Sequence, residues 1–145
     1  EVDHDVFIPE TYISRDDFRL EYYRRLASAK TNYEVHEIHQ ELRDIYGKIP
    51  VELGNLFNVL EIKLTCASLG INKIIIHSEE CEAFFISEIY ENKGRNFKEW
   101  IAELVAKANL SIEIIPDDIL KIRLKRKGNI VINLDNVKNF LQSLL

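Results

Sequence analysis

The segment His36-Glu37-Ile38-His39 contains the residue types of a zinc protease site. Such a site needs two histidines at positions i and i+4 of one helix, with a glutamate between them as the general base. Here the histidines stand at i and i+3, and the sequence offers no obvious third ligand. Two surface histidines on a helix therefore explain the segment better than a metal site, and we expect no bound metal.

Adjacent carboxylates occur at Asp16-Asp17, Glu79-Glu80 and Asp117-Asp118. Each pair lies where we expect a helix start or a turn, so capping and turn formation explain these residues better than acid–base chemistry. The five glycines are not clustered into a phosphate-binding loop. No serine or cysteine has the setting of a nucleophile. The sequence thus predicts no catalytic residues and no cofactor.

One basic cluster extends from Lys121 to Lys127. On a strand, every second side chain faces the same side, so three of its cations share one face. Such a face is either simply solvated, a charged edge strand that blocks unwanted pairing, or a contact for nucleic acid or another partner. The candidate nucleic-acid contacts are Lys121, Arg123, Lys125 and Arg126.

The helix predicted between Thr31 and Pro50 places four acidic side chains in a row along one side, which we call the acidic row. Thr31 and Glu34 have the spacing of a capping box, and Gly47 can end the last turn. The apolar residues that repeat with helical spacing are Val35, Ile38, Leu42 and Ile45. Beside this apolar stripe, Glu34, Glu37, Glu41 and Asp44 fall within a second stripe about 80° wide. This second stripe either faces solvent or binds a basic partner.

The composition predicts one globular domain over residues 1–145, because 145 residues with 46% hydrophobic content can bury a core. Residues 1–70 carry 8 Lys and Arg against 13 Asp and Glu, a net charge of −5, whereas residues 71–145 carry 11 of each. An acidic half does not suit general nucleic-acid binding. Two cysteines without metal-site spacing indicate reduced thiols, and no apolar run is long enough for a membrane span, so we expect a cytoplasmic protein. The absence of methionine, even at position 1, suggests a piece of a longer chain.

The order of elements predicts an α+β fold, with an N-terminal three-helix half followed by a small, mostly antiparallel sheet and two further helices. The third helix starts near Pro50 and ends at Gly70. Short strands are expected at residues 73–77, 81–89, 111–115, 119–124 and 130–134. Ser14, Asn96 and Asp135 are the predicted N-caps of the remaining helices.

Two segments resemble a known family. Residues 7–13, Phe-Ile-Pro-Glu-Thr-Tyr-Ile, followed by the helix at 19–29, resemble the start of the C-terminal (TRCF) domain of bacterial transcription-repair coupling factors. Residues 41–50, Glu-Leu-Arg-Asp-Ile-Tyr-Gly-Lys-Ile-Pro, resemble that family's E-L-x-D-R-F-G-x-L-P segment, with Ile45 where the family usually has arginine. The resemblance covers roughly residues 7–76.

The resemblance implies a non-catalytic, autoinhibitory domain within an ATP-dependent DNA translocase that displaces stalled RNA polymerase and recruits the repair protein UvrA. In this family the domain docks on the UvrB-like N-terminal module of the same protein and hides the surface that UvrA needs. The family's acidic contacts to that basic module correspond to Glu41 and Asp44, and Glu37 flanks them by helical geometry alone. The alternative is an accessory domain that contacts nucleic acid through the basic strand.

Overall fold

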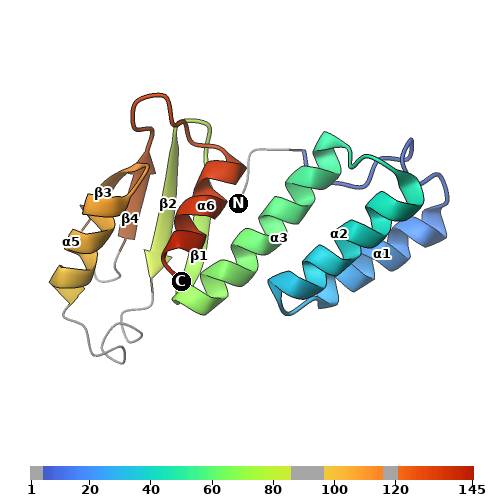
Figure 1. Cartoon of the computed structure of the whole chain (residues 1–145), viewed down its shortest axis with the longest axis horizontal. Coiled ribbons are helices and arrows are strands. Elements are labelled where there is room, and N and C mark those ends of the chain that lie inside the picture. The colour runs from blue at the N-terminus through green and yellow to red at the C-terminus, as the bar shows by residue number, and fades with distance from the viewer. Residues whose placement is uncertain (1–4, 86–96, 116–120) are drawn as a thin grey trace. The chain divides into compact units, whose positions relative to one another are not determined.

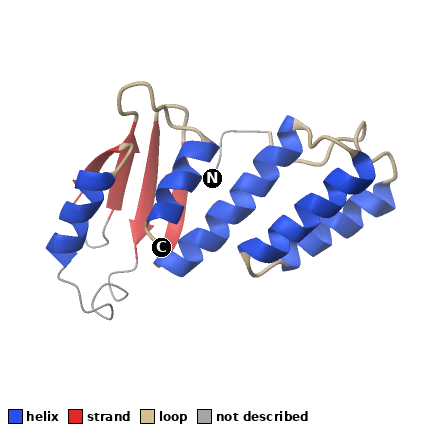
Figure 2. Cartoon of the chain, viewed as in Figure 1, coloured by secondary structure: helices blue, strands red, loops and turns tan. Residues whose placement is uncertain are grey.

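A computed structural model describes residues 5–85, 97–115 and 121–145 of the chain. Within these ranges, three helices come first, and four strands and two further helices follow in the order β1, β2, α5, β3, β4 and α6, so the predicted α+β class is confirmed (Figures 1 and 2). The described chain divides into two compact units: a helical unit up to Leu64 and a sheet unit from Thr65 to Leu145. Each unit is described below by itself.

The helical unit contains α1 (Asp16–Ser28), α2 (Asn32–Tyr46) and most of α3 (Val51–Leu69). An extended N-terminal segment and the inward faces of the helices enclose one apolar core. This core consists of Ile8, Ile13, Tyr22, Leu26, Val35, Ile38, Leu42, Leu53 and Phe57. Because apolar burial is the main favourable term in folding, these contacts fix the position of α2 beside α1.

Helix α2 has the predicted bounds. The Thr31 hydroxyl accepts a hydrogen bond from the Glu34 amide, and Gly47 ends the helix with a φ of 88°. The Glu34 carboxylate accepts from the amide of Lys30, one residue before the N-cap. Ile45 is 62% exposed, so its predicted place in the apolar stripe is wrong. Tyr46 packs against the core instead, since its position on the helix is closer to Val35 and Leu42.

The N-terminal segment is attached to α2 through Tyr12. Its hydroxyl lies 3.0 Å from the carbonyl oxygen of Leu42 and 2.8 Å from that of Gly47, at the C-terminal end of α2. The Tyr12 ring also packs 5.6 Å from the ring of Tyr46. The predicted cap at Ser14 is wrong, because α1 begins after Arg15 and has no side-chain cap.

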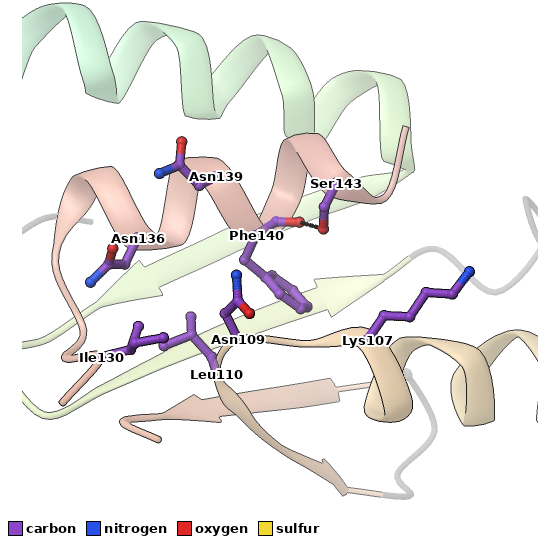
Figure 3. Close-up of a pocket in the computed structure, with 8 residues that line it drawn as sticks. All are labelled: Lys107, Asn109, Leu110, Ile130, Asn136, Asn139, Phe140 and Ser143. Atoms are coloured by element: carbon purple, nitrogen blue, oxygen red, sulfur yellow. Dashed lines mark hydrogen bonds between the residues drawn. The ribbon is translucent and has the colours of Figure 1, made fainter. Parts of the chain in front are cut away.

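The sheet unit is a four-stranded antiparallel sheet with the order β1-β2-β4-β3. Its elements are β1 (Ile71–Ile76), β2 (Glu80–Phe85), α5 (Phe97–Lys107), β3 (Ser111–Ile115), β4 (Lys121–Lys125) and α6 (Leu134–Ser143). Strands β2 and β4 alternate between buried apolar and partly exposed residues, so one sheet face belongs to the core. Figures 1 and 3 show α6 beside β1 and β2, where it buries Val137, Phe140 and Leu141.

Several local predictions for the sheet unit are wrong. Residues 130–134 form no strand within the described chain; only a single bridge joins Lys127 to Ile130 around a turn at Gly128. Asn133, not Asp135, caps α6, because its side chain accepts the Asn136 amide. The predicted cap at residue 96, the end of the second strand after residue 85 and the start of β4 before residue 121 lie outside the described residues.

Candidate functional site

Three members of the acidic row on α2 are exposed: Glu34, whose carboxylate accepts the Lys30 amide at the start of the helix, and further along Glu37 and Asp44. Glu37 raises the pKa of Tyr33, which stands one turn earlier and is 69% exposed. Asp44 has no hydrogen-bond or ion-pair partner among the residues that the structure describes. An unpaired surface carboxylate can accept both N–H groups of a guanidinium. The exposed part of the row can therefore bind a cationic side chain.

Glu41 differs from its neighbours in the row because α1 already supplies it with partners. Arg25 contacts both carboxylate oxygens, with 3.2 Å between Nη2 and Oε1 for the longer of the two hydrogen bonds. The hydroxyl of Tyr22 also lies close enough to the carboxylate to lower the pKa of Glu41. Glu41 is thus half-buried and ion-paired, which corrects the prediction that it lies on a fully exposed stripe.

These contacts shift the pKa values of the groups involved. The hydrogen bond from Arg25 lowers the pKa of Glu41, and the same contact raises the pKa of Arg25. Burial, with a smaller effect of the hydrogen bond to Glu41, raises the pKa of Tyr22 to about 12. At neutral pH the pair is therefore a carboxylate and a guanidinium beside a neutral phenol.

Sequence reasoning missed that Arg25 of α1 forms an ion pair with Glu41, a member of the acidic row. Arg25 precedes the buried Leu26, and Glu41 precedes the buried Leu42. Each charged residue thus stands beside the core stripe of its own helix. Opposite charges at such flanking positions on consecutive antiparallel helices are a signal that could have identified the pair.

The basic strand β4 lies inside the sheet, between β2 and β3, so its interpretation as a protected edge is wrong. Its outward cations face carboxylates on both neighbouring strands. Lys121 pairs with Glu82, and the Arg123 guanidinium is 3.5 Å from both Glu80 and Glu113. Lys125 lies 3.9 Å from Glu113.

We call these six residues the charge ladder: Lys121, Arg123 and Lys125 of β4, Glu80 and Glu82 of β2, and Glu113 of β3. Three cations and three carboxylates give the ladder no net charge. Arg126 follows it as an exposed residue. Because binding to the phosphate backbone depends on excess positive charge, this arrangement gives little support to a nucleic-acid contact.

A pocket of about 150 Å³ opens in the sheet unit between the end of α5 and α6. Figure 3 shows the Phe140 ring facing the Asn109 side chain, while Lys107 extends away from the other polar groups. The lining residues are Lys107, Asn109, Leu110, Ile130, Asn136, Asn139, Phe140 and Ser143. None of them is a carboxylate, histidine or cysteine, so this pocket lacks the side chains of an acid–base pair.

Within the described ranges, no three His, Cys, Asp or Glu side chains gather as a metal site. His36 and His39 stack on one another with ring centroids 6.3 Å apart, and His39 packs 4.8 Å from Phe57. Across the same ranges, no helix is both long and apolar enough to cross a membrane.

Comparison with known proteins identifies the family. The profile of the TRCF domain matches residues 2–95, which is more than half of the chain. The chain belongs to the TRCF domain family. This TRCF domain is 30% identical over 127 residues to the transcription-repair-coupling factor of Rickettsia bellii, an alignment covering 88% of this chain and 11% of the relative. It is 40% identical over 70 residues to that of Mycobacterium tuberculosis, covering 48% of this chain and 6% of the relative.

The TRCF domain thus spans about a tenth of the length of the first of these relatives. A crystal structure of the C-terminal domain of a transcription-repair coupling factor has a TM-score of 0.79 to it, at 17% sequence identity. The match covers 99% of this chain and 88% of that chain. The shared fold therefore extends beyond residue 77, past the segments in which family motifs can be recognised in the sequence by eye.

Proposed function

We propose that this TRCF domain is the autoinhibitory docking domain of a transcription-repair coupling factor. It binds the UvrB-like N-terminal module of the same protein and covers the surface that UvrA uses. The whole protein is then an ATP-dependent DNA translocase that displaces RNA polymerase stalled at DNA damage. Within it this domain has no catalytic role of its own and regulates access to the repair partner.

The observation that carries the proposal is the unpaired, exposed carboxylate of Asp44, with Glu37 exposed on the same helix. Glu41, the remaining member of the row, takes part with its outer lone pairs, since Arg25 occupies the others. Charge pairs of this kind mainly set orientation and encounter rate, which suits a contact that must also release. A contact made by exposed charges also weakens with salt, because the Debye length is only about 10 Å at 0.1 M.

The nucleic-acid contact through Lys121, Arg123, Lys125 and Arg126 remains the second candidate. It has less support, since the three strand cations belong to the neutral charge ladder. Only Arg126 stands outside the ladder, and one cation supplies little of the counterion release that drives binding to DNA.

Binding of this chain to the separate UvrB-like module, measured by calorimetry at low salt, tests the docking. We expect Asp44→Lys to weaken binding by about tenfold or more, because it replaces an interfacial attraction with repulsion. Glu79→Lys is the matched control: it makes the same change of charge at an exposed position in the turn between β1 and β2. Binding that is insensitive to both salt and Asp44→Lys would place the contact elsewhere.

The regulatory half of the proposal is tested in the full-length protein. Asp44→Lys should increase capture of UvrA by the intact coupling factor, because loosening the docked domain uncovers the UvrA surface. Glu79→Lys should leave UvrA capture at the parent level. Equal UvrA capture by the parent and the Asp44→Lys protein would argue against autoinhibition, even if the isolated domain docks.

A further inference from the structure

Arg25 stands where a docking arginine of the partner would bind. It is on α1, next to the acidic row of α2, and its guanidinium contacts both oxygens of Glu41. A bidentate guanidinium–carboxylate contact is the geometry that an arginine from another surface would use. The domain thus carries its own arginine on one of the carboxylates proposed to bind the partner.

The pair is open to exchange because it is neither buried nor fully solvated. The side chains of Arg25 and Glu41 are 39% and 38% exposed. A guanidinium arriving from solvent can therefore reach the outer side of the carboxylate. Pairs with this degree of exposure contribute little to stability, so the domain can lose the contact without unfolding.

Arg25 also has a second carboxylate within reach on its own helix. Glu21 stands four residues earlier, and its charge adds to the shift in the pKa of Arg25. A glutamate four residues before an arginine is the favourable order for an ion pair on a helix. Arg25 can therefore turn from Glu41 to Glu21 when another cation takes its place.

Asp44 lies one helical turn beyond Glu41, and residues three apart have Cβ atoms about 5–6 Å apart. A cation between these two carboxylates gains from both, but it is repelled by Arg25 while Arg25 holds Glu41. The buried Tyr22, whose hydroxyl lowers the pKa of Glu41, favours the charged carboxylate from the core side. Arg25 therefore weakens the docking site without distorting it.

We propose that Arg25 is an internal competitor for Glu41 and sets the strength of docking on the acidic row. This inference rests on the proposed function, since it describes the regulation of the same surface. Its partner chemistry is an arginine side chain, which the Glu41–Asp44 pair accepts once Arg25 is displaced. The residue acts on the partner through Glu41, so it is a positioning residue of the site.

The test compares Arg25→Gln with Arg24→Gln in this chain. Arg24 is the exposed neighbour of Arg25 on α1, so its replacement removes the same charge about 100° away around the helix. The probes are the UvrB-like module and a hexa-arginine peptide, and affinities are measured by calorimetry at low salt. Urea unfolding confirms that each variant is folded.

We expect Arg25→Gln to tighten binding of both probes about three- to tenfold, because it removes a repulsive charge beside Glu41. Arg24→Gln should stay within about twofold of the parent, because its charge points away from the row. In the double variant Arg25→Gln, Glu41→Gln the gain should disappear, since no carboxylate is released. A purely structural role of Arg25 predicts the opposite sign, a loss of affinity in Arg25→Gln.

Two results would overturn the inference. One is an affinity of folded Arg25→Gln equal to or below that of the parent for both probes, and the other is equal tightening by Arg24→Gln. Failure of the proposed function gives a different pattern: no variant binds the module, while the hexa-arginine peptide still binds Arg25→Gln more tightly. The two probes thus separate competition at Glu41 from the identity of the docking partner.

Discussion

Replacing Tyr12 with phenylalanine removes one oxygen atom and tests how the N-terminal segment holds the end of α2. The ring stays in place against Tyr46, so the change leaves the aromatic packing intact. The lost hydroxyl lies within hydrogen-bond distance of two carbonyl oxygens, those of Leu42 and Gly47. Because Gly47 is exposed, water can replace that half of the interaction, whereas the Leu42 carbonyl is partly buried.

The net loss is therefore close to that of one ordinary hydrogen bond, about 1 kcal/mol. With a urea dependence of roughly 2 kcal/mol per molar, the unfolding midpoint should fall by about 0.5 M. Far-UV circular dichroism in a urea titration measures this midpoint.

Tyr33→Phe provides the matched control for the loss of a phenol oxygen. Tyr33 is 69% exposed, and its hydroxyl interacts with the surface residue Glu37, which raises its pKa. Its unfolding midpoint should equal that of the parent. A Tyr12→Phe midpoint within about 0.1 M of the parent would refute the idea that this hydroxyl stabilises the end of α2.

Three further predictions follow from charge and burial. Cys66 and Cys81 should resist iodoacetamide at pH 8 in the native chain and react in urea, as read by mass spectrometry, because burial raises their pKa values to about 11 and about 12. Fast labelling of the native chain would contradict this. The pKa of Glu41 in the folded chain lies below its ordinary 4.5, so its charge stabilises the fold above pH 4.5, and this stabilisation is lost as the pH falls through the folded pKa. Between about pH 5 and pH 3, the free energy of unfolding should therefore fall less in Glu41→Gln than in the parent. Duplex DNA at low salt should give no electrophoretic shift with this chain, because the charge ladder is neutral; a shift abolished by replacing the β4 cations would favour the nucleic-acid contact.

The acidic row shows which features a sequence can predict. The bounds of α2 depend on two local signals, the hydroxyl of Thr31 at its start and the glycine at position 47 at its end. The sequence alone predicts both. Exposure of Asp44 also follows from helical geometry alone. The pairing of Glu41 with Arg25 spans sixteen positions, so predicting it requires comparing the charges that flank the core stripes of α1 and α2 rather than the pattern of one helix.

The sheet unit shows the same limit more strongly. The alternation of β4 was predicted, but its place between β2 and β3 depends on pairing across long separations. Residues 130–134 have the β-branched composition of a strand, yet the side chain of Asn133 starts a helix there by accepting the Asn136 amide. A local polar contact thus prevailed over strand propensity.

The charge ladder also determines which alignment of the strands is allowed. Successive residues of β4 alternate between the ladder and the core, where Ile122 and Leu124 are buried. A shift of β4 by one residue would turn its three cations into the apolar interior and expose both of these side chains. A shift by two would keep the faces and, in one direction, would place Lys121 and Arg123 directly opposite Glu82 and Glu80, so the ladder alone does not exclude it. The ladder therefore discriminates against the one-residue misalignment, so a sheet with little charge to offer a ligand can still use its charges to select which face of β4 turns inward during folding.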